Sequence, residues 1–412
     1  MSELKILMLT GDLSGQVSGG MGIATAEIAR HLASISNLHL IKSGDENFPS
    51  IRNVSTVNAS SPARQIVSYS VFPGVQKEPL QYDFLISPYR TNDAQNLPSY
   101  KTNPSTLEVV ETVASSYLEE VALYNQKVID LAQTLVFDVI YCHDWTTFQA
   151  GISLKLQTGK KLVLHIHSLE TDRKPDNKNP NIYYLERKAM DYADAVITVS
   201  EYTRNLIRKN YEIYPGKIQV VHNAIAPLSI NKAAKETNEL NVLFMGRLTR
   251  QKGIDNFISM AEVVFENYPD VQFVIAGEGE LRTEIEGRIE SSEAADNISL
   301  LGYLNSEEKN DLLAITDIFC MPSESEPFGL VALEAASAGI PCVISKQSGI
   351  AEIMTSALQA DFNDVSGFAL SITTLLESES LRTTVAEEQA KNIKALNWNN
   401  SAANILEILK KL

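Results

Sequence analysis

A chain of 412 residues is too long for one ordinary hydrophobic core, so two domains are expected. With 44% hydrophobic and 21% charged residues, its composition is that of a folded globular protein. The net charge of −16 repels phosphate backbones and anionic lipid surfaces, which disfavours nucleic acid as the main partner but permits a local basic pocket.

Neither a membrane span nor a secretory signal is expected. The N-terminal apolar run at residues 6–9 is far shorter than a signal-peptide core, and no stretch approaches the roughly 18 apolar residues of a membrane span. We therefore expect a cytoplasmic protein without integral membrane association. The three cysteines, Cys142, Cys320 and Cys342, lie in apolar runs and are odd in number, which predicts buried free thiols.

Short runs rich in Val and Ile alternate with longer segments of helical periodicity, a pattern typical of parallel strands covered by helices. In the first half, strands are expected at 5–9, 82–87, 137–142, 161–167, 195–200 and 218–223, and helices at 23–35, 106–134 and 201–209. A polar stretch with a proline follows residue 225 and is typical of a linker. A second strand series is expected at 242–245, 272–276, 298–301, 318–321 and 341–344.

Two successive doubly wound units predict an α/β protein of two facing Rossmann-like domains, at 1–226 and 227–397. Ligands of such sheets bind outside the carboxyl ends of the strands, so the site should lie between the domains. The final segment, 398–412, is an amphipathic helix candidate with Ile405, Ile408 and Leu409 on one face.

The first candidate binding element is a glycine cluster between the first strand and the first helix. Its glycines are Gly11, Gly15, Gly19, Gly20 and Gly22. The cluster does not match the G-x-G-x-x-G dinucleotide pattern, which disfavours an oxidoreductase. A glycine-rich turn can still bring backbone amides and a helix N-terminus against a phosphate, whereas the simplest alternative is a flexible loop.

The second candidate lies at 241–257, where an expected strand ends at Gly246. Arg247, Arg250, Lys252 and Gly253 follow before a helix. In an acidic protein, cations at the carboxyl end of a strand suit a diphosphate, with Arg as a planar fork and Lys as a point charge. The alternative is a solvated run of charges.

Histidines form the third candidate. His143 is followed by Asp144 at one strand end, and His165 and His167 lie at another. The His-x-His spacing puts both rings on one face of a strand, as zinc hydrolases require. A metal needs further ligands, and no carboxylate or cysteine pair has convincing spacing. We therefore expect polar contacts for His143 or His167 and a satisfied buried role for His165.

Two glutamates separated by seven residues, Glu326 and Glu334, form the fourth candidate. Pro327 disfavours helical geometry at Glu326, so Glu326 should lie in a loop and Glu334 in the following helix. On one continuous helix they would be about 12 Å apart, wider than the roughly 5–9.5 Å of glycosidase carboxylate pairs. A helix beginning near Gly329 would also present free amides to an anion. Two charges that only favour a helix N-terminus remain the alternative.

Seven segments, "GGMG", "HDW", "HIHS", "GRLTRQKG", "AGEGE", "LGYL" and "EPFGLVALEAASAGIP", together resemble the retaining nucleotide-sugar glycosyltransferases of family 4 and the related glycogen and starch synthases. The resemblance covers almost the whole chain. It implies the two-domain GT-B fold, with the acceptor held mainly by the N-terminal domain, the nucleotide sugar by the C-terminal domain, and the last helix crossing back to the first domain.

By this resemblance, Arg247 and Lys252 hold the donor diphosphate. Glu326 bonds the hydroxyls of the donor sugar, and Glu334 binds the ribose. His167 contacts the transferred sugar near its C6 hydroxyl. Further donor contacts are implied for Gly19, Gly20, Gly22, Gly277, Tyr303, Leu304, Phe328, Gly329, Leu330 and Val331, and acceptor contacts for His143 and Asp144.

The implied chemistry is transfer of a hexose with retention, in which the departing phosphate helps to deprotonate the acceptor. The donor would be an ADP-, UDP- or GDP-sugar and the acceptor a carbohydrate. No cofactor is implied, and no Asp-x-Asp motif is present, so we expect a metal-independent enzyme in which the two cations take the role of a metal.

The segment "HIHSLETDR" looks most like the glycogen-synthase side of the family and favours glucosyl transfer to an α-glucan. Bacterial glycogen synthases carry a lysine two residues before the Gly-Gly pair, where this chain has Val17. The alternatives are a family 4 enzyme with a small-sugar, lipid-linked or polysaccharide acceptor, a noncatalytic sugar-nucleotide-binding protein, and a metal-dependent hydrolase built on the histidines.

Overall fold

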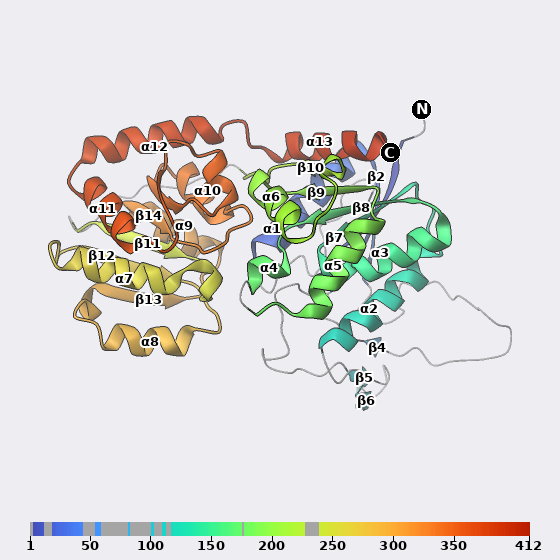
Figure 1. The fold of residues 1–412 in the computed structure, drawn as a ribbon, viewed down its shortest axis with the longest axis horizontal. Helices are drawn as coiled ribbons and strands as arrows, with labels where there is room; N and C mark the ends of the chain where they lie inside the picture. The colour runs from blue at the N-terminus through green and yellow to red at the C-terminus, as the bar shows by residue number, and fades with distance from the viewer. Residues whose placement is uncertain are drawn as a thin grey trace.

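The computed structural model describes residues 3–11, 19–43, 54–58, 81–82, 100–102, 109–112, 117–174, 177–226 and 239–412. Two parallel sheets, one of seven strands and one of six, lie side by side with helices on their faces (Figure 1). The expected α/β class is thus confirmed.

The first sheet has the order β10-β9-β8-β7-β1-β2-β3. Its strands are β1 (Lys5–Leu9), β2 (Asn37–Lys42), β3 (Val54–Asn58), β7 (Val139–His143), β8 (Lys161–Ile166), β9 (Ala195–Thr198) and β10 (Ile218–Val220). Its helices are α1 (Gly20–Ile35), α2 (Tyr117–Ala132), α3 (Trp145–Thr158), α4 (Glu170–Arg173), α5 (Pro180–Tyr192) and α6 (Glu201–Asn210). A small antiparallel sheet contains β4 (Gln81–Tyr82), β5 (Tyr100–Thr102) and β6 (Val109–Thr112).

The second sheet has the order β13-β12-β11-β14-β15-β16. Its strands are β11 (Asn241–Met245), β12 (Gln272–Ala276), β13 (Ile298–Gly302), β14 (Ile318–Met321), β15 (Cys342–Ser345) and β16 (Leu358–Ala360). The helices are α7 (Ile254–Phe265), α8 (Arg282–Glu290), α9 (Ser306–Ile315), α10 (Leu330–Ser337), α11 (Val365–Leu376), α12 (Glu379–Ile393) and α13 (Trp398–Lys410).

Most of the expected elements are present, but two expectations were wrong. The helix expected at 106–134 begins only at Tyr117, and β6 occupies Val109–Thr112 instead. Two valines and a threonine in that short run favour a strand, because branching at Cβ restricts their side chains in a helix. The strand expected at 218–223 ends at Val220. Of the strand expected at 82–87, everything after Tyr82 lies outside the described residues.

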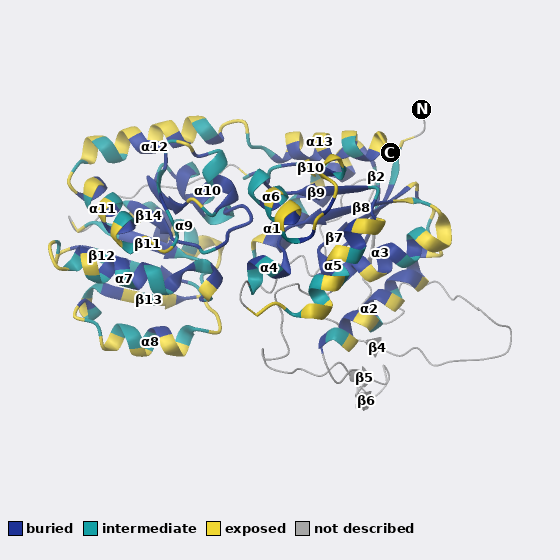
Figure 2. Cartoon of the chain, viewed as in Figure 1, coloured by how far each residue is buried: buried dark blue, intermediate teal, exposed yellow. Residues whose placement is uncertain are grey.

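The strands form buried cores under both helical layers (Figure 2). Strands β7 and β15 are buried at every position, as expected for parallel strands covered on both faces. Cys142, Cys320 and Cys342 are buried free thiols, which confirms their expected state.

Helix α13 packs on α1 and joins the core of the first sheet. Ile405 and Leu409 are buried there, and Ile408 is partly buried against them. The Ser401 hydroxyl donates to the carbonyl oxygen of His222 at 2.9 Å. The last helix is therefore a structural part of the N-terminal unit.

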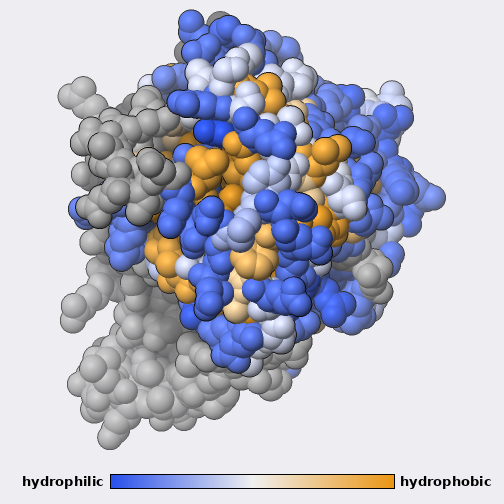
Figure 3. All heavy atoms as spheres, turned by 90° about the vertical axis from the view of Figure 1, so that its left-hand side faces the viewer, coloured by the Kyte–Doolittle hydropathy of each residue, from blue (hydrophilic) through white to orange (hydrophobic). Residues whose placement is uncertain are grey.

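Figure 3 shows one face of the molecule, with the C-terminal unit toward the viewer. On that face of the C-terminal unit, hydrophobic residues form small groups separated by hydrophilic ones. Within the described ranges, every helix is too short or too polar to cross a membrane.

Candidate active site

The segments that follow the carboxyl ends of the two sheets meet each other. Gly20, at the start of α1, lies against α10, because a Cβ added there would be 3.3 Å from Leu330 Cδ1. The Ser200 hydroxyl, after β9, donates to the carbonyl oxygen of Pro327 at 2.6 Å. The glycine cluster and the two-glutamate segment, far apart in sequence, are therefore neighbours in the fold.

Lys252 and Glu326 form an ion pair at this junction. Lys252 ends a 3₁₀ turn (Arg250–Lys252) after β11, and its Nζ lies 2.5 Å from Glu326 Oε2. The turn requires glycine at Gly253, where φ is 70° and an added Cβ would lie 1.9 Å from the Pro322 oxygen. Glu326 is only 6% exposed. Lysine carries three donors, so the pair leaves N–H groups of Lys252 for a phosphate.

Arg247 lies shortly before the same 3₁₀ turn, between the end of β11 and Arg250. Its Nη2 is 3.5 Å from Gln251 Oε1, and the Gln251 side chain in turn donates to the carbonyl oxygen of Ser325 at 3.0 Å. Both predicted diphosphate ligands thus follow the same strand and border the loop that carries Glu326. Arg250 is exposed at the start of the turn.

Glu334 is separated from Glu326, as the proline predicted. Glu326 lies in the loop, α10 begins after the N-cap Gly329, and Glu334 lies inside the helix. Glu334 Oε1 pairs with Nζ of Lys309, on α9, at 2.5 Å. Because each carboxylate has its own lysine, they are not arranged to share a proton. This geometry favours two binding groups over an acid/base pair.

Gly329 has a structural reason to be glycine. Its φ is 109°, and a Cβ there would lie 2.9 Å from Ile350 Cγ2. Phe328 is buried just before it, and Leu330 and Val331 form the first turn of α10, whose amides have no partner inside the helix.

The remaining donor-side candidates frame this region. Gly277 has φ of 147° and packs against the backbone of Gly246, which leaves no room for a side chain. Tyr303, 59% exposed, and Leu304, partly buried, come just before α9. Their donor contacts remain predictions.

At the start of α1, Gly19 has φ of 55° and serves as the N-cap, while Gly22 is buried inside the helix. The Gly15 and Val17 positions lie outside the described residues.

The three histidines pack together at the carboxyl ends of β7 and β8 in the first sheet. His143 Nδ1 and His167 Nε2 are 2.9 Å apart, and the Tyr141 hydroxyl is 2.6 Å from His165 Nδ1. Burial lowers the pKa of His167 to about 3 and holds the pKa values of His143 and His165 well below the usual range. The rings are therefore neutral hydrogen-bonding groups. His165 is buried as expected, but only its Nδ1 has a partner, because its Nε2 makes no hydrogen bond within the described residues, so the expectation of a satisfied ring was wrong for that nitrogen.

Nitrogen atoms of these histidines lie within 4.8 Å of one another, close enough to test for a metal. The rings of His165 and His167, however, stack with centroids 4.4 Å apart and planes 16° apart. An imidazole binds a metal through a lone pair in its ring plane, and lone pairs in two stacked planes do not converge on one ion. A tetrahedral zinc site does not fit this arrangement.

Asp144 is held in an unusual conformation beside His167. Its φ is 55°, and its Oδ1 accepts from the backbone N–H of His167 at 2.7 Å. Oδ2 is buried and has no hydrogen-bond partner among the described residues. Burial raises the pKa of Asp144 to about 7, against the opposing charge of Arg173. That oxygen is an unused hydrogen-bond acceptor in the buried part of the site.

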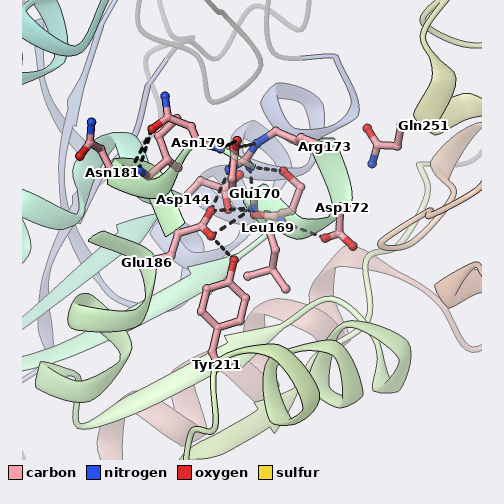
Figure 4. Close-up of polar contacts among 12 residues, drawn as sticks. Asp144, Leu169, Glu170, Asp172, Arg173, Asn179, Asn181, Glu186, Tyr211 and Gln251 are labelled. Carbon is pink, nitrogen blue, oxygen red and sulfur yellow. Dashed lines mark hydrogen bonds and ion pairs between the residues drawn. The ribbon is translucent and has the colours of Figure 1, made fainter. Parts of the chain in front are cut away.

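Sequence reasoning missed the acidic cluster around Arg173 (Figure 4). The Arg173 guanidinium pairs with Glu170 at 3.2 Å and with Glu186 at 2.8 Å, and the Tyr211 hydroxyl donates to Glu186. Burial raises the pKa of Glu186 to about 7. The available signal was the charged run that begins shortly after the end of β8, a position where parallel sheets place ligands.

Comparisons with known proteins show which family the chain resembles. The family model described as "Glycosyl transferases group 1" matches residues 227–392, and that described as "Glycosyltransferase Family 4" matches residues 96–227. The uncharacterized glycosyltransferase MJ1607 of Methanocaldococcus jannaschii is 29% identical over 296 residues, 66% of this chain and 75% of the relative. A glycogen synthase of Mycobacterium tuberculosis is 28% identical over 249 residues, 58% of this chain and 60% of the relative.

Among solved structures, HepE from Anabaena in complex with UDP and glucose superposes with a TM-score of 0.70 at 18% identity. The match covers 99% of this chain and all of HepE. At that identity the likeness is evidence of fold, and the fold is the two-domain one expected from the sequence motifs. The chain is therefore a glycosyltransferase of family 4 with the GT-B fold.

Proposed function

We propose that this enzyme transfers a hexosyl group, with glucose as the expected sugar, from a nucleoside diphosphate sugar to a carbohydrate hydroxyl, with retention of anomeric configuration. The observation that carries the proposal is the Lys252–Glu326 pair, 2.5 Å apart at the junction of the two domains. In this proposal Lys252 is the cation for the diphosphate, and Glu326, directly beside it, is the carboxylate for the sugar.

In this mechanism Lys252 and Arg247 stabilise the negative charge that builds on the leaving diphosphate. Fixed charges aimed at developing charge usually supply the largest part of catalysis. Glu326 accepts hydrogen bonds from sugar hydroxyls, and Glu334 accepts them from the ribose while Lys309 holds its other oxygen. No protein nucleophile is required, because the departing phosphate takes the acceptor proton. The reaction is proposed to proceed without a metal.

On the acceptor side, the neutral ring of His167 hydrogen-bonds the transferred sugar, and Asp144 Oδ2 receives an acceptor hydroxyl. The likeness to a glycogen synthase supports an α-glucan acceptor, and HepE, solved with UDP and glucose, supports a uridine nucleotide and glucose. A small-sugar, lipid-linked or other polysaccharide acceptor in the same family is the second candidate. The stacked histidines speak against a metal-dependent hydrolase.

The test is a screen of UDP-, ADP- and GDP-sugars, each with α-glucan, small-sugar and lipid-linked acceptors. It is scored by nucleotide release and by the anomeric configuration of the product. Transfer with retention, lost in Lys252→Ala and unaffected by EDTA, is the expected result. An inverted product would refute the retaining mechanism, and nucleotide binding without transfer to any acceptor would favour a noncatalytic role.

A further inference from the structure

The residues on both sides of Glu326 are bonded to the other domain. On one side, the Ser325 hydroxyl donates to Asp172 Oδ1 at 2.7 Å, and the Tyr202 hydroxyl lies 3.1 Å from the same Ser325 oxygen. Asp172 belongs to α4 and Tyr202 to α6, both in the N-terminal domain. Since Ser325 has one hydroxyl proton and gives it to Asp172, Tyr202 is the donor to Ser325.

On the other side of Glu326, two hydroxyl groups reach the carbonyl oxygen of Pro327. Ser200 Oγ is 2.6 Å from it and Thr203 Oγ1 is 3.3 Å from it. Gly349 completes this contact, because an added Cβ would lie 2.3 Å from the Pro327 oxygen and 2.6 Å from Ser200 Cβ. The two domains are packed too closely here for any larger residue.

The C-terminal domain holds the Glu326 carboxylate through Lys252 and holds the loop backbone through hydrogen bonds of its own. Within it, the Glu326 N–H donates to the Gln347 oxygen at 2.9 Å, and the Gly349 N–H donates to the Glu326 oxygen at 2.9 Å. The Ser325 hydroxyl and the Pro327 carbonyl also use partners from across the junction, and Asp172, Ser200 and Thr203 are fully buried. Buried polar groups need partners, so these bonds are maintained only while the domains are together.

Asp172 also connects the loop to the sugar-side histidine. It lies five residues after His167, and its Oδ2 accepts from the Leu169 N–H at 2.8 Å. The segment that carries His167 and the loop that carries Glu326 are therefore joined directly through Asp172 and Ser325.

We propose that Asp172, Ser200 and Thr203 are positioning residues that fix the loop on both sides of Glu326 when the two domains close. The inference rests on the proposed function of Glu326 in holding the donor sugar. The nucleotide binds to the C-terminal domain whether or not these bonds exist. The sugar is held in its reactive position only after the N-terminal domain, with the acceptor, has docked.

The kinetic test uses full-length Ser325→Ala, Thr203→Val and the double variant. We expect kcat for transfer to fall at least ten-fold in the double variant, whereas the Kd for UDP, or for ADP or GDP if wild type prefers it, stays within two-fold. Thr316→Val is the matched control, because Thr316 Oγ1 also donates to a backbone carbonyl, that of Leu312 at 2.7 Å, but at the C-terminal end of α9 and within one domain. This control should keep the wild-type kcat.

A conservative pair at Asp172 separates positioning from general damage. Asp172→Asn keeps an oxygen that can accept from Ser325 and should retain much more activity than Asp172→Ala. Equal losses in the two variants, or a fall in nucleotide affinity that matches the fall in kcat, would overturn the inference.

Amide hydrogen exchange of residues 323–330 in the full-length protein gives a readout that needs no activity. Exchange should be faster in the Ser325→Ala/Thr203→Val variant than in wild type and in Thr316→Val. If wild type transfers no sugar, the proposed function fails while the exchange still decides whether the contacts hold the loop. Wild-type exchange and wild-type kcat in the double variant, at unchanged Tm, would refute the positioning role.

Discussion

The C-terminal domain brings two lysine–glutamate ion pairs to the site, whereas the N-terminal domain brings neutral histidines and a carboxyl group with a raised pKa. The difference follows from burial. Lys252 and Lys309 are partly exposed and pair with glutamates, while the histidine rings and Asp144 are buried. Burial disfavours a charged form unless a partner offsets it.

This contrast matches the two halves of the proposed reaction. A diphosphate that leaves with negative charge requires cations, and the C-terminal domain supplies them. A sugar and its acceptor hydroxyl are uncharged, and neutral hydrogen-bonding groups suit them without a large desolvation cost. Each of the following experiments separates the charged side from the neutral side.

The largest expected effect is on the charged side. Lys252→Ala removes a cation from the diphosphate and leaves Glu326 buried without its partner, so the activation barrier should rise by at least about 2–4 kcal/mol. Steady-state kcat/KM for transfer measures the loss. Lys391→Ala, which breaks an exposed pair with Glu388, is the control and should be neutral. Near wild-type turnover in Lys252→Ala would remove the basis of the proposed mechanism.

The buried carboxyl group of Glu186, in the N-terminal domain, should make the free energy of unfolding depend on pH. Burial raises the folded-state pKa of Glu186 from 4.5 to about 7. Because the folded pKa lies above the unfolded one, the stabilisation by the protonated form is complete below pH 4.5 and is lost as pH rises through about 7. The free energy of unfolding should therefore fall by about 3 kcal/mol across this window because of Glu186.

Glu186→Gln should make this decline in stability shallower, and urea unfolding at pH 5 and pH 7.5 measures the change. Glu280→Gln, an exposed position, should leave the decline unchanged. Identical pH dependence in wild type and Glu186→Gln would mean that Glu186 is ionised throughout.

For the neutral side, His167→Ala should lower kcat/KM about ten-fold, equal to about 1.4 kcal/mol, because one neutral hydrogen bond to the sugar is lost. Since burial lowers the pKa of His167 to about 3, the ring is already neutral at pH 6. The ratio of wild-type to variant activity should thus be constant from pH 6 to pH 8. A ratio that changes ten-fold in that range would assign His167 a proton-transfer role.

The smallest effect is expected at Lys309. Lys309→Met removes the partner of Glu334 but keeps the length of the side chain, so the carboxylate becomes less well oriented toward the ribose. A partly exposed ion pair contributes about 0.5–1 kcal/mol, which corresponds to a two- to five-fold rise in donor KM with unchanged kcat. Lys411→Met, in an exposed pair with Glu407, is the control. An effect on kcat alone would exclude a ribose-side role for this pair.

The same contrast explains which parts of the site could be predicted from sequence. Lys252, Glu326 and Glu334 lie in short segments where the chain itself provides the signal: cations after a strand, a proline that breaks a helix, and a helix start. The separation of the two glutamates followed from Pro327 alone. The ion pairs with Lys252 and Lys309 join residues 74 and 25 positions apart, and no local pattern specifies them.

The neutral side was less predictable because its properties come from packing. The sequence indicated that His165 and His167 share a face of a strand, but their stacking with His143 depends on the pairing of β7 with β8. Glu186 comes from α5 and Tyr211 from the end of α6, so the cluster around Arg173 forms only when several helices assemble. Edge strands such as β16 were missed because they are short.

Helix α13 has a consequence for biosynthesis. Its residues Trp398, Ile405 and Leu409 belong to the same core as β1 and α1, although more than 350 positions separate them along the chain. A ribosome releases the N-terminal strands long before it releases this helix, so the first sheet must wait with part of its apolar face uncovered while the second domain is made. Native assembly of the N-terminal domain is therefore one of the last steps of folding during synthesis.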